Sequence, residues 1–289
     1  MDISLALGAG GAKGNSHIGV LYQLEKHGFR IRAIAGTSFG GVVGAVYAAG
    51  YSIDELEEIF ARADQHHLYG RRPQDNASLY GLAGIEQWLI DTLGDRTFAD
   101  LKIPFAVVAV DLNSAHEVIL CEGRVRDAIL ATIALPAIFS PFRTDGMELV
   151  DGGIFDPVPV SIARSLAPHL PVVAVVLANP VGEPTRLRPF KLPLPEPIVQ
   201  QLTRLRITQA LGVGMRTLDV SDRLLTDLRL KIEKPDVIVR PEVSDIGLLD
   251  TVDVHEVAKR GEVALEAVLP ELKRVTTWSN RLRRGFLGE

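Results

Sequence analysis

The feature that most constrains this chain is a serine set in a sharp turn between a predicted strand and a predicted helix. An apolar run at residues 31–35 leads into Gly-Thr-Ser-Phe-Gly-Gly at 36–41, and small apolar residues follow at 42–49. The first run predicts a buried strand and the last a central helix. Glycines on both sides of Ser38 allow a tight turn that exposes its hydroxyl before the N–H groups of the helix. This pattern is typical of the nucleophile elbow of serine hydrolases.

Two other interpretations of this stretch are open at this point. In a chain with 26 glycines a G-x-S-x-G pattern can arise by chance, and Ser38 would then be an ordinary turn residue. Residues 33–53 also lack charge and contain Gly40-x-x-x-Gly44, which resembles a transmembrane helix. Thr37, Ser38 and the glycines of this segment argue against a membrane span. We therefore expect a buried strand, a turn and a helix.

Composition and charge narrow the class of protein. The 289 residues are 47% hydrophobic with a formal net charge of −5. These values predict one large α/β domain, with or without an appendage, and argue against nucleic acid as the main partner. The start of the chain has no basic region or cleavage-type site, so we expect no signal peptide. Cys121, the single cysteine, excludes an intrachain disulfide and is consistent with the cytoplasm; we expect it to end a buried strand at 118–121.

Alternating strand and helix patterns predict an α/β fold, a three-layer sandwich around a mostly parallel sheet. Strands are expected at 3–7, 31–35, 105–111, 117–121, 147–150, 171–178 and 236–240, and helices at 15–27, 52–60, 85–93, 126–134, 198–231 and 254–269. Residues 66–81 predict a surface loop near the site, and the prolines of 180–197 predict an extended loop. We divide the chain into a core at 1–180, a proline-rich and helical lid-like region at 181–235, and a C-terminal strand, helix and basic tail at 236–289.

A glycine-rich loop at residues 8–14 follows the first predicted strand. One interpretation is a phosphate cradle for a nucleotide, but the P-loop pattern is absent, and Lys13 stands where the dinucleotide pattern needs its third glycine. The other interpretation gives the N–H groups of this loop to the oxyanion that forms when Ser38 attacks an ester. The hydrolase interpretation accounts for both glycine-rich turns at once.

A nucleophilic serine needs a base. In the common order of serine, acid and histidine, His169 and His255 are the candidates, although neither has a supporting local pattern and each is more typical of a solvated surface histidine. His17 lies in the helix after the glycine-rich loop, where packing or orientation is its expected role. Asp151 ends a predicted strand before two glycines and can stand at the same sheet edge as Ser38, although Asp-Gly-Gly is also a common turn.

Three motifs taken together resemble the patatin-like phospholipases: Gly10-Gly11-Ala12-Lys13-Gly14, Gly36-Thr37-Ser38-Phe39-Gly40 and Asp151-Gly152-Gly153. The resemblance covers about residues 3–180, and looser similarity to bacterial members continues at 234–241 and 246–250. It implies a Ser38–Asp151 dyad without histidine, acting through an acyl-enzyme intermediate. It also implies an oxyanion hole at the first motif, built from Gly10, Gly11, Ala12 and Lys13, with Gly8, Gly14, Gly36, Gly40, Gly152 and Gly153 supporting the turns.

The resemblance further implies hydrolysis of carboxylic esters of lipids, such as phospholipids or lysophospholipids. We expect no cofactor, and no metal either, because the sequence has no carboxylate-rich loop with the spacing of calcium ligands. Lys13 matches a basic position of the family and could orient the loop or attract an anionic head group, while Ala9 stands where the family often has glycine. A non-catalytic lipid- or protein-binding relative is the alternative. Two hypotheses concern lipid contact: the basic tail at 272–289 adheres peripherally to a membrane surface, and the apolar residues Phe190, Leu192, Leu194 and Ile198 belong to a lid over the acyl pocket.

Overall fold

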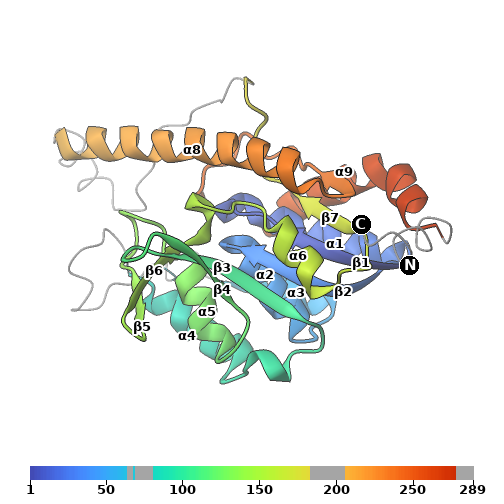
Figure 1. Ribbon diagram of the computed structural model, residues 1–289, viewed down its shortest axis with the longest axis horizontal. Helices are drawn as coiled ribbons and strands as arrows, with labels where there is room; N and C mark the ends of the chain where they lie inside the picture. Colours follow the sequence, from blue (N-terminus) through green and yellow to red (C-terminus); the bar gives the residue numbers. More distant parts are fainter. Residues whose placement is uncertain (64–67, 69–80, 183–205, 278–289) are drawn as a thin grey trace.

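The computed structural model describes residues 1–63, 68, 81–182 and 206–277. These residues form an α/β fold around one mixed sheet of eight strands, in the order β5-β6-β3-β2-β1-β7-β8 with β4 paired to β3 (Figure 1). The strands from β8 to β3 run parallel to one another, and β4, β5 and β6 add antiparallel pairings at the other end. The predicted fold class, with its mostly parallel sheet, is confirmed.

The helices and strands follow the order expected from the sequence. The strands are β1 (Asp2–Leu7), β2 (Arg30–Thr37), β3 (Phe105–Asp111), β4 (His116–Leu120), β5 (Phe142–Thr144), β6 (Met147–Asp151), β7 (Val172–Val175) and β8 (Val237–Val239). The helices are α1 (Ser16–Lys26), α2 (Phe39–Ala48), α3 (Ile53–Arg62), α4 (Ala83–Leu93), α5 (Val125–Thr132), α6 (Val160–Leu166), α8 (Arg206–Glu233) and α9 (Val254–Val275). Short 3₁₀ turns lie at η1 (Gly11–Asn15), η2 (Phe98–Asp100) and η3 (Gly152–Ile154).

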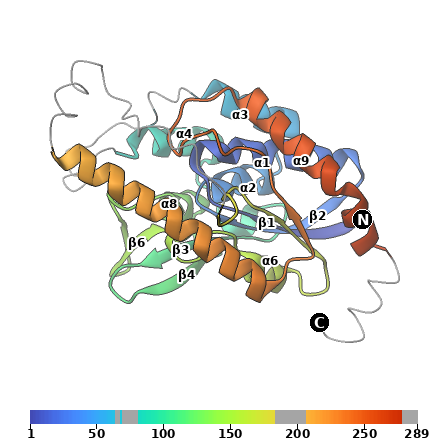
Figure 2. The ribbon, with the colours of Figure 1, turned by 90° about the horizontal axis from the view of Figure 1, so that it is seen from above.

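The two faces of the sheet bury different clusters, as the alternation of side chains along a strand requires. Ile3, Leu5 and Leu7 of β1 pack in the larger cluster, which includes side chains from α1, α2, α3, α4, α5 and α9. Ala6 belongs to the smaller cluster, with side chains from α6 and Leu230 of α8. The sheet is therefore the middle layer of three, and α8 crosses the outer side of the thinner layer (Figures 1 and 2).

Strand β3 fixes the relative position of the two sheet-edge motifs. On β3, Thr37 pairs with Val108 and Asp151 pairs with the next residue, Ala109. Strand β4 occupies one edge of β3 over residues 107–111. Strands β2 and β6 therefore both lie along the other edge of β3, one after the other. The end of the strand before Ser38 and the end of the strand that carries Asp151 therefore meet at one point of the sheet.

The C-terminal helix packs on the core with very little space between backbones. A Cβ at Gly19 of α1 would overlap the carbonyl of Ala258 in α9, and a Cβ at Gly261 would overlap the carbonyl of Ser16. The two glycines face each other's helix, so α1 and α9 approach more closely than side chains would allow. This contact ties the last helix to the segment that follows the glycine-rich loop.

Some expectations need correction. Cys121 is exposed, and the strand before it is only partly buried, because β4 is an edge strand with one neighbour. The sequence interpretation also missed β5 and α6, which are among the shortest elements. Most of the loop expected at 66–81, most of the proline-rich segment at 180–197, the proposed lid residues and positions 278–289 of the tail lie outside the described residues. No helix in the described part of the chain combines the length and apolar character needed to cross a bilayer.

Candidate active site

Ser38 lies in a strained turn between β2 and α2. Its backbone has φ 53° and ψ −126°, a conformation rare for a residue with a side chain, as a nucleophile elbow requires. We expected the flanking glycines to supply conformational freedom, but neither Gly36 nor Gly40 has a positive φ. A Cβ at Gly36 would lie 2.6 Å from the Cα of Gly41, and one at Gly40 would overlap the carbonyl of Leu7. Close backbone approach therefore explains these glycines.

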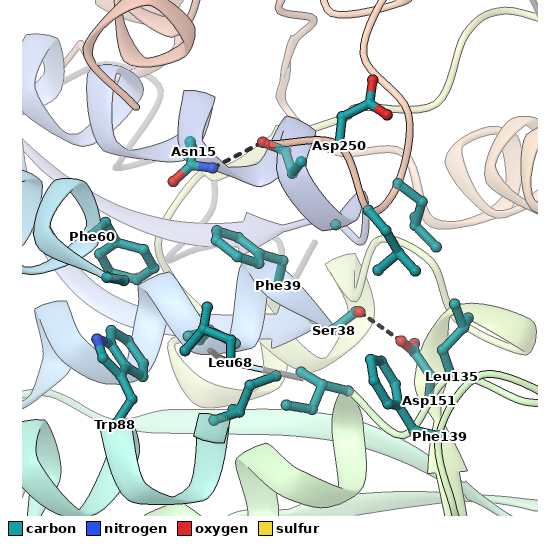
Figure 3. A pocket seen from close by; sticks show the side chains of 18 of the residues that line it. Asn15, Ser38, Phe39, Phe60, Leu68, Trp88, Leu135, Phe139, Asp151 and Asp250 are labelled. Carbon is teal, nitrogen blue, oxygen red and sulfur yellow. Dashed lines mark hydrogen bonds between the residues drawn. The ribbon is translucent and has the colours of Figure 1, made fainter. Parts of the chain in front are cut away.

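The hydroxyl of Ser38 donates a hydrogen bond to Asp151 (Figure 3). The distance from Ser38 Oγ to Asp151 Oδ2 is 2.6 Å, and the amide of Gly153 donates to Oδ1 at 2.8 Å. Asp151 is only 4% exposed. Burial raises the pKa of Asp151 to about 6, despite the opposing effect of the hydrogen bonds from Ser38 and Gly153. Near neutral pH the carboxylate is a better proton acceptor than an ordinary aspartate.

Two threonines fix the position of the turn that carries Ser38. Thr132, at the end of α5, accepts a hydrogen bond from the Ser38 amide at 3.0 Å and donates its own hydroxyl proton to the carbonyl of Val108. Thr37 donates to the carbonyl of Asp156 at 2.9 Å. Both threonine side chains are fully buried. The serine is therefore fixed by contacts with elements that lie far from it in the sequence.

The glycine-rich loop presents two amides beside the dyad. Among the residues that the structure describes, the Gly10 and Gly11 amides have no hydrogen-bond acceptor, whereas Ala12 donates to the carbonyl of Leu248 at 2.9 Å and Lys13 to that of Gly10 at 3.3 Å. Gly11 has φ 55°, and a Cβ there would overlap the carbonyl of Leu248. Of the four residues expected to form an oxyanion hole, Gly10 and Gly11 therefore have amides available for an oxyanion, and the amides of Ala12 and Lys13 are already bonded.

His17 supports this loop from below. Its ring is fully buried, and Nε2 donates to the carbonyl of Gly8 at 2.9 Å. Burial lowers the pKa of His17 to about 4, so the imidazole is neutral at physiological pH. The expected orienting role fits this geometry, because the bond holds the residue at which the loop leaves β1.

The other candidate bases lie elsewhere. His169 is exposed, and His255 is 67% exposed with Nδ1 2.6 Å from Glu57 Oε1. No histidine of the described chain hydrogen-bonds to Ser38 or Asp151. The arrangement therefore supports the aspartate as the group that accepts the serine proton, and the two histidines are surface residues.

An apolar cavity of about 120 Å³ opens beside Ser38. Figure 3 shows the rings of Phe39, Phe60, Trp88 and Phe139 around it, with Ser38 and Asp151 at one end. Phe60 contacts both Phe39 and Trp88, with ring centroids 5.6 and 5.3 Å apart. Such a cavity accepts a hydrocarbon chain, because it replaces water contacts of the chain by contacts with aromatic and aliphatic surfaces.

A larger cavity of about 410 Å³ reaches the same dyad from the other side. Its walls come from the glycine-rich loop, α8 and residues 244–250. Most of the lining is apolar, and its charged residues besides Asp151 are Lys13, Arg216, Asp219, Asp222, Asp245 and Asp250. Ser38, Leu135, Asp151, Leu248, Leu249 and Asp250 line both cavities. Ser38 and Asp151 thus lie where a small apolar cavity meets a larger cavity that also contains charged side chains.

The sequence indicated that Ser38 and Asp151 lie together, as their hydrogen bond shows, but it did not indicate the residues that surround them. Thr132 and Asp222 carry no local motif, and they reach the site only through the packing of α5 and α8. Leu248 lies in the segment 246–250 that resembles bacterial members of the family, but nothing in that pattern placed it beside the glycine-rich loop. Groups of three or more histidine, cysteine or acidic side chains with metal-binding geometry are absent from the part of the chain that the structure describes.

Comparison with known proteins gives the family. The patatin-like phospholipase family matches residues 5–164. An uncharacterised NTE family protein of Mycobacterium tuberculosis is 37% identical over 187 residues, which cover 64% of this chain and 51% of the relative. Lysophospholipase NTE1 of Saccharomyces cerevisiae is 29% identical over 177 residues, covering 56% of this chain and 10% of that protein. The chain matches about half the length of its mycobacterial relative, and a far smaller share of the yeast enzyme.

A solved structure supports the same fold. The crystal structure of VipD from Legionella pneumophila superposes with a TM-score of 0.52 over 93% of this chain and 66% of VipD, at 12% sequence identity. That likeness concerns the fold alone. The family match spans both the serine elbow and the Asp-Gly-Gly turn that meet on β3. The chain therefore belongs to the patatin-like phospholipase family.

Proposed function

We propose that the protein is a serine hydrolase that cleaves carboxylic ester bonds of lipids through a Ser38–Asp151 dyad. The observation that carries the proposal is the 2.6 Å hydrogen bond from the Ser38 hydroxyl to a buried aspartate, at the meeting point of the apolar cavity and the larger cavity. The apolar cavity would hold the acyl chain, and the larger cavity, which contains charged side chains, the alcohol of the ester. Membership in the family and the name of the yeast relative, a lysophospholipase, support this substrate class.

The mechanism proceeds in two halves. Ser38 Oγ attacks the acyl carbonyl carbon while its proton passes to Asp151 Oδ2, and the amides of Gly10 and Gly11 hydrogen-bond to the oxyanion. Asp151 then gives that proton to the departing alcohol oxygen, and the acyl group stays on Ser38. In the second half Asp151 takes a proton from water, the hydroxide oxygen attacks the acyl carbon, and the proton returns to Ser38 as the fatty acid leaves.

Hydrolysis of a neutral chromogenic ester tests this proposal. The wild type is expected to release p-nitrophenol from p-nitrophenyl hexanoate, and Ser38→Ala should lose at least about a thousandfold in kcat/KM because the nucleophile is gone. Ser161→Ala, which alters an exposed serine of α6, is the matched control and should behave as the wild type. Equal activity in Ser38→Ala and the wild type would refute the proposal.

The lipid class is tested separately with monoacyl and diacyl phospholipids. Release of fatty acid from these substrates, lost in Ser38→Ala, is the expected result. A wild type that cleaves the chromogenic ester but none of these lipids would refute the lipid assignment while leaving the dyad intact. A folded wild type that cleaves no ester at all would favour the non-catalytic alternative.

A further inference from the structure

Helix α8 carries a row of large apolar side chains on the side that faces away from the sheet. The row, here called the α8 stripe, consists of Val213, Val220, Leu224, Leu228 and Ile232. Each of these side chains is between 46% and 74% exposed, whereas Thr226 and Leu230 on the other side of the helix are buried. Intervals of four and seven residues align the row along one face of the helix. A continuous exposed apolar surface of this kind marks a contact with another molecule.

The α8 stripe is long and narrow. At 1.5 Å per residue it spans about 29 Å from its first to its last residue. Helix α8 lies along the outside of the molecule in both views (Figures 1 and 2). Thr217 continues the pattern, so that positions 213, 217, 220 and 224 are separated by steps of four, three and four residues. Two helices that pack as a coiled coil use this spacing, so the surface fits another helix.

Two residues of opposite charge lie on the same flank of the α8 stripe. Arg216 is in the N-terminal half of the helix and Asp227 in the C-terminal half, and helical periodicity puts them within about 20° of each other around the axis. Arg216 also lines the larger cavity, but no hydrogen bond or ion pair joins it to another described residue. Asp227 lies 2.6 Å from Lys231 within α8. In an antiparallel pair of helices the same flanks meet, so Arg216 of one copy would reach Asp227 of the other.

The apolar residues fit the same arrangement. A two-fold axis halfway between the two charged residues places Val220 of one copy against Leu224 of the other. It also places Val213 of one copy between Leu228 and Ile232 of the other. Each contact then occurs twice, as it must where two copies meet through the same surface. The α8 stripe is therefore complementary to itself in both shape and charge.

We propose that the α8 stripe is the interface of a homodimer, in which the α8 helices of two copies pack antiparallel across a two-fold axis. This assembly does not depend on ester hydrolysis. It covers the outer side of α8 and leaves the other side as a wall of the larger cavity. One pair of helices buries an area near the lower end of the roughly 1,200–2,000 Å² of stable interfaces, so we expect a dissociation constant on the order of 10 µM.

Sedimentation equilibrium of the full chain tests the dimer, at concentrations from about tenfold below to about tenfold above that constant. The wild type should change from monomer to dimer over this range. Leu224→Glu buries a charge at the centre of the interface and should weaken the dimer by at least about a hundredfold. Val263→Glu is the matched control, because Val263 lies on α9 and is 63% exposed. It should dimerise as the wild type does, and both variants should keep the wild-type circular dichroism.

Exchange of the two charges tests the antiparallel arrangement. Arg216→Asp and Asp227→Arg should each weaken the dimer about tenfold, because each brings like charges together across the interface. The double variant should recover most of the wild-type affinity, because the ion pairs form again with their signs exchanged. In a parallel pair of helices the two residues do not meet, and the effects of the substitutions would add.

Three results would overturn the proposal: a wild type that stays monomeric at the highest concentration, a dimer that survives Leu224→Glu, or additive losses in the double variant. Sedimentation with vesicles of phosphatidylcholine and phosphatidylglycerol identifies the alternative partner. A monomeric wild type that binds these vesicles, together with a Leu224→Glu variant that does not, would assign the α8 stripe to a lipid surface instead of a second copy.

Discussion

The guanidinium of Arg229 on α8 lies 3.7 Å from the carboxylate of Asp156, a buried residue of the loop that follows the proposed base. Arg229 also bonds to Glu233 at 2.8 Å and donates to the carbonyl of Phe155 at 3.2 Å. The carbonyl of Asp156 accepts the hydroxyl proton of Thr37, the residue before the nucleophile. One arginine thus joins α8, which forms a wall of the larger cavity, to the loop after Asp151, and that loop is bonded in turn to the residue before Ser38.

Removing this arginine should destabilise the protein most at high pH. Burial raises the pKa of Asp156 to about 7, and Arg229 opposes that increase. Arg229→Ala should therefore raise it further and cost about 2–3 kcal/mol at pH 8, because the wild-type carboxylate is ionised there and loses its attraction to the arginine. As the pH falls below the folded pKa of Asp156, the carboxyl is protonated and the loss should shrink.

Urea denaturation of Arg229→Ala at pH 8 and pH 5.5 measures this effect. Arg143→Ala is the control, because Arg143 forms an ion pair with Glu148 in which its side chain is 76% exposed. That exposed pair should contribute less than about 1 kcal/mol at either pH. Equal destabilisation by both substitutions would show that Arg229 does not hold α8 to the site.

The pH dependence of activity should follow Asp151. Its pKa is raised to about 6, and the carboxylate form accepts the serine proton. For an uncharged ester, kcat/KM should rise with pH, by about tenfold per unit below 6, and reach a plateau above about 7. The control is Asp222→Asn, because the pKa of Asp222, about 7, lies close enough to confuse the profile. If that substitution abolished the acid limb, the assignment of the limb to Asp151 would be wrong.

The hydroxyl of Thr132 should affect the rate of catalysis, because it helps to fix the position of Ser38. Thr132→Val keeps the volume of the side chain but removes the acceptor of the Ser38 amide, so the strained turn loses a buried hydrogen bond. We expect a loss of about 1–2 kcal/mol in the free energy of unfolding and a fall in kcat of about tenfold, with little change in KM. Thr132→Ser retains the hydroxyl and should recover most of kcat. A wild-type kcat in Thr132→Val would show that Thr132 does not position Ser38 for catalysis.

The contact between α1 and α9 gives a prediction about stability alone. Gly261→Ala would place a Cβ on the carbonyl of Ser16 and separate the helices, at a cost of about 2 kcal/mol or more. Gly214→Ala in α8 is the matched control, because no atom lies within 4 Å of the added Cβ. It should stabilise the helix by up to about 1 kcal/mol. In thermal unfolding, Gly261→Ala should lower the midpoint temperature and Gly214→Ala should raise it slightly. Equal changes in the two variants would contradict the close packing of α1 on α9.

The local sequence predicts the dyad because both its members end strands and are followed by glycines. Ser38 and Asp151 come from turns with strong local signatures, but β2 runs parallel to β3 and β6 antiparallel to it, so the carboxyl ends of β2 and β6 meet head to head along β3. The exact meeting depends on the register at Val108 and Ala109, which no local pattern specifies. Family resemblance, rather than strand order, identified the pair.

Other features could not be predicted because they depend on neighbours distant in the sequence. The apolar residues before Cys121 indicate a strand but not its place at an edge, so the exposed Ile119 and Cys121 were expected to be buried. Asp222 is one acidic residue of an amphipathic helix, and only the packing of α8 places it in the wall of the cavity that the glycine-rich loop also lines. The glycines of the elbow were recognised, but for their conformational freedom instead of their close backbone contacts.

Covalent labelling of Ser38 shows whether Asp151 activates it. Intact mass after treatment with a fluorophosphonate is measured on the wild type, Ser38→Ala and Asp151→Asn, because this reagent reports an activated serine without assuming a substrate. The account predicts one adduct on the wild type, none on Ser38→Ala, and labelling slowed by about a hundredfold or more in Asp151→Asn. An adduct that persists in Ser38→Ala, or a folded wild type that forms none, would contradict it.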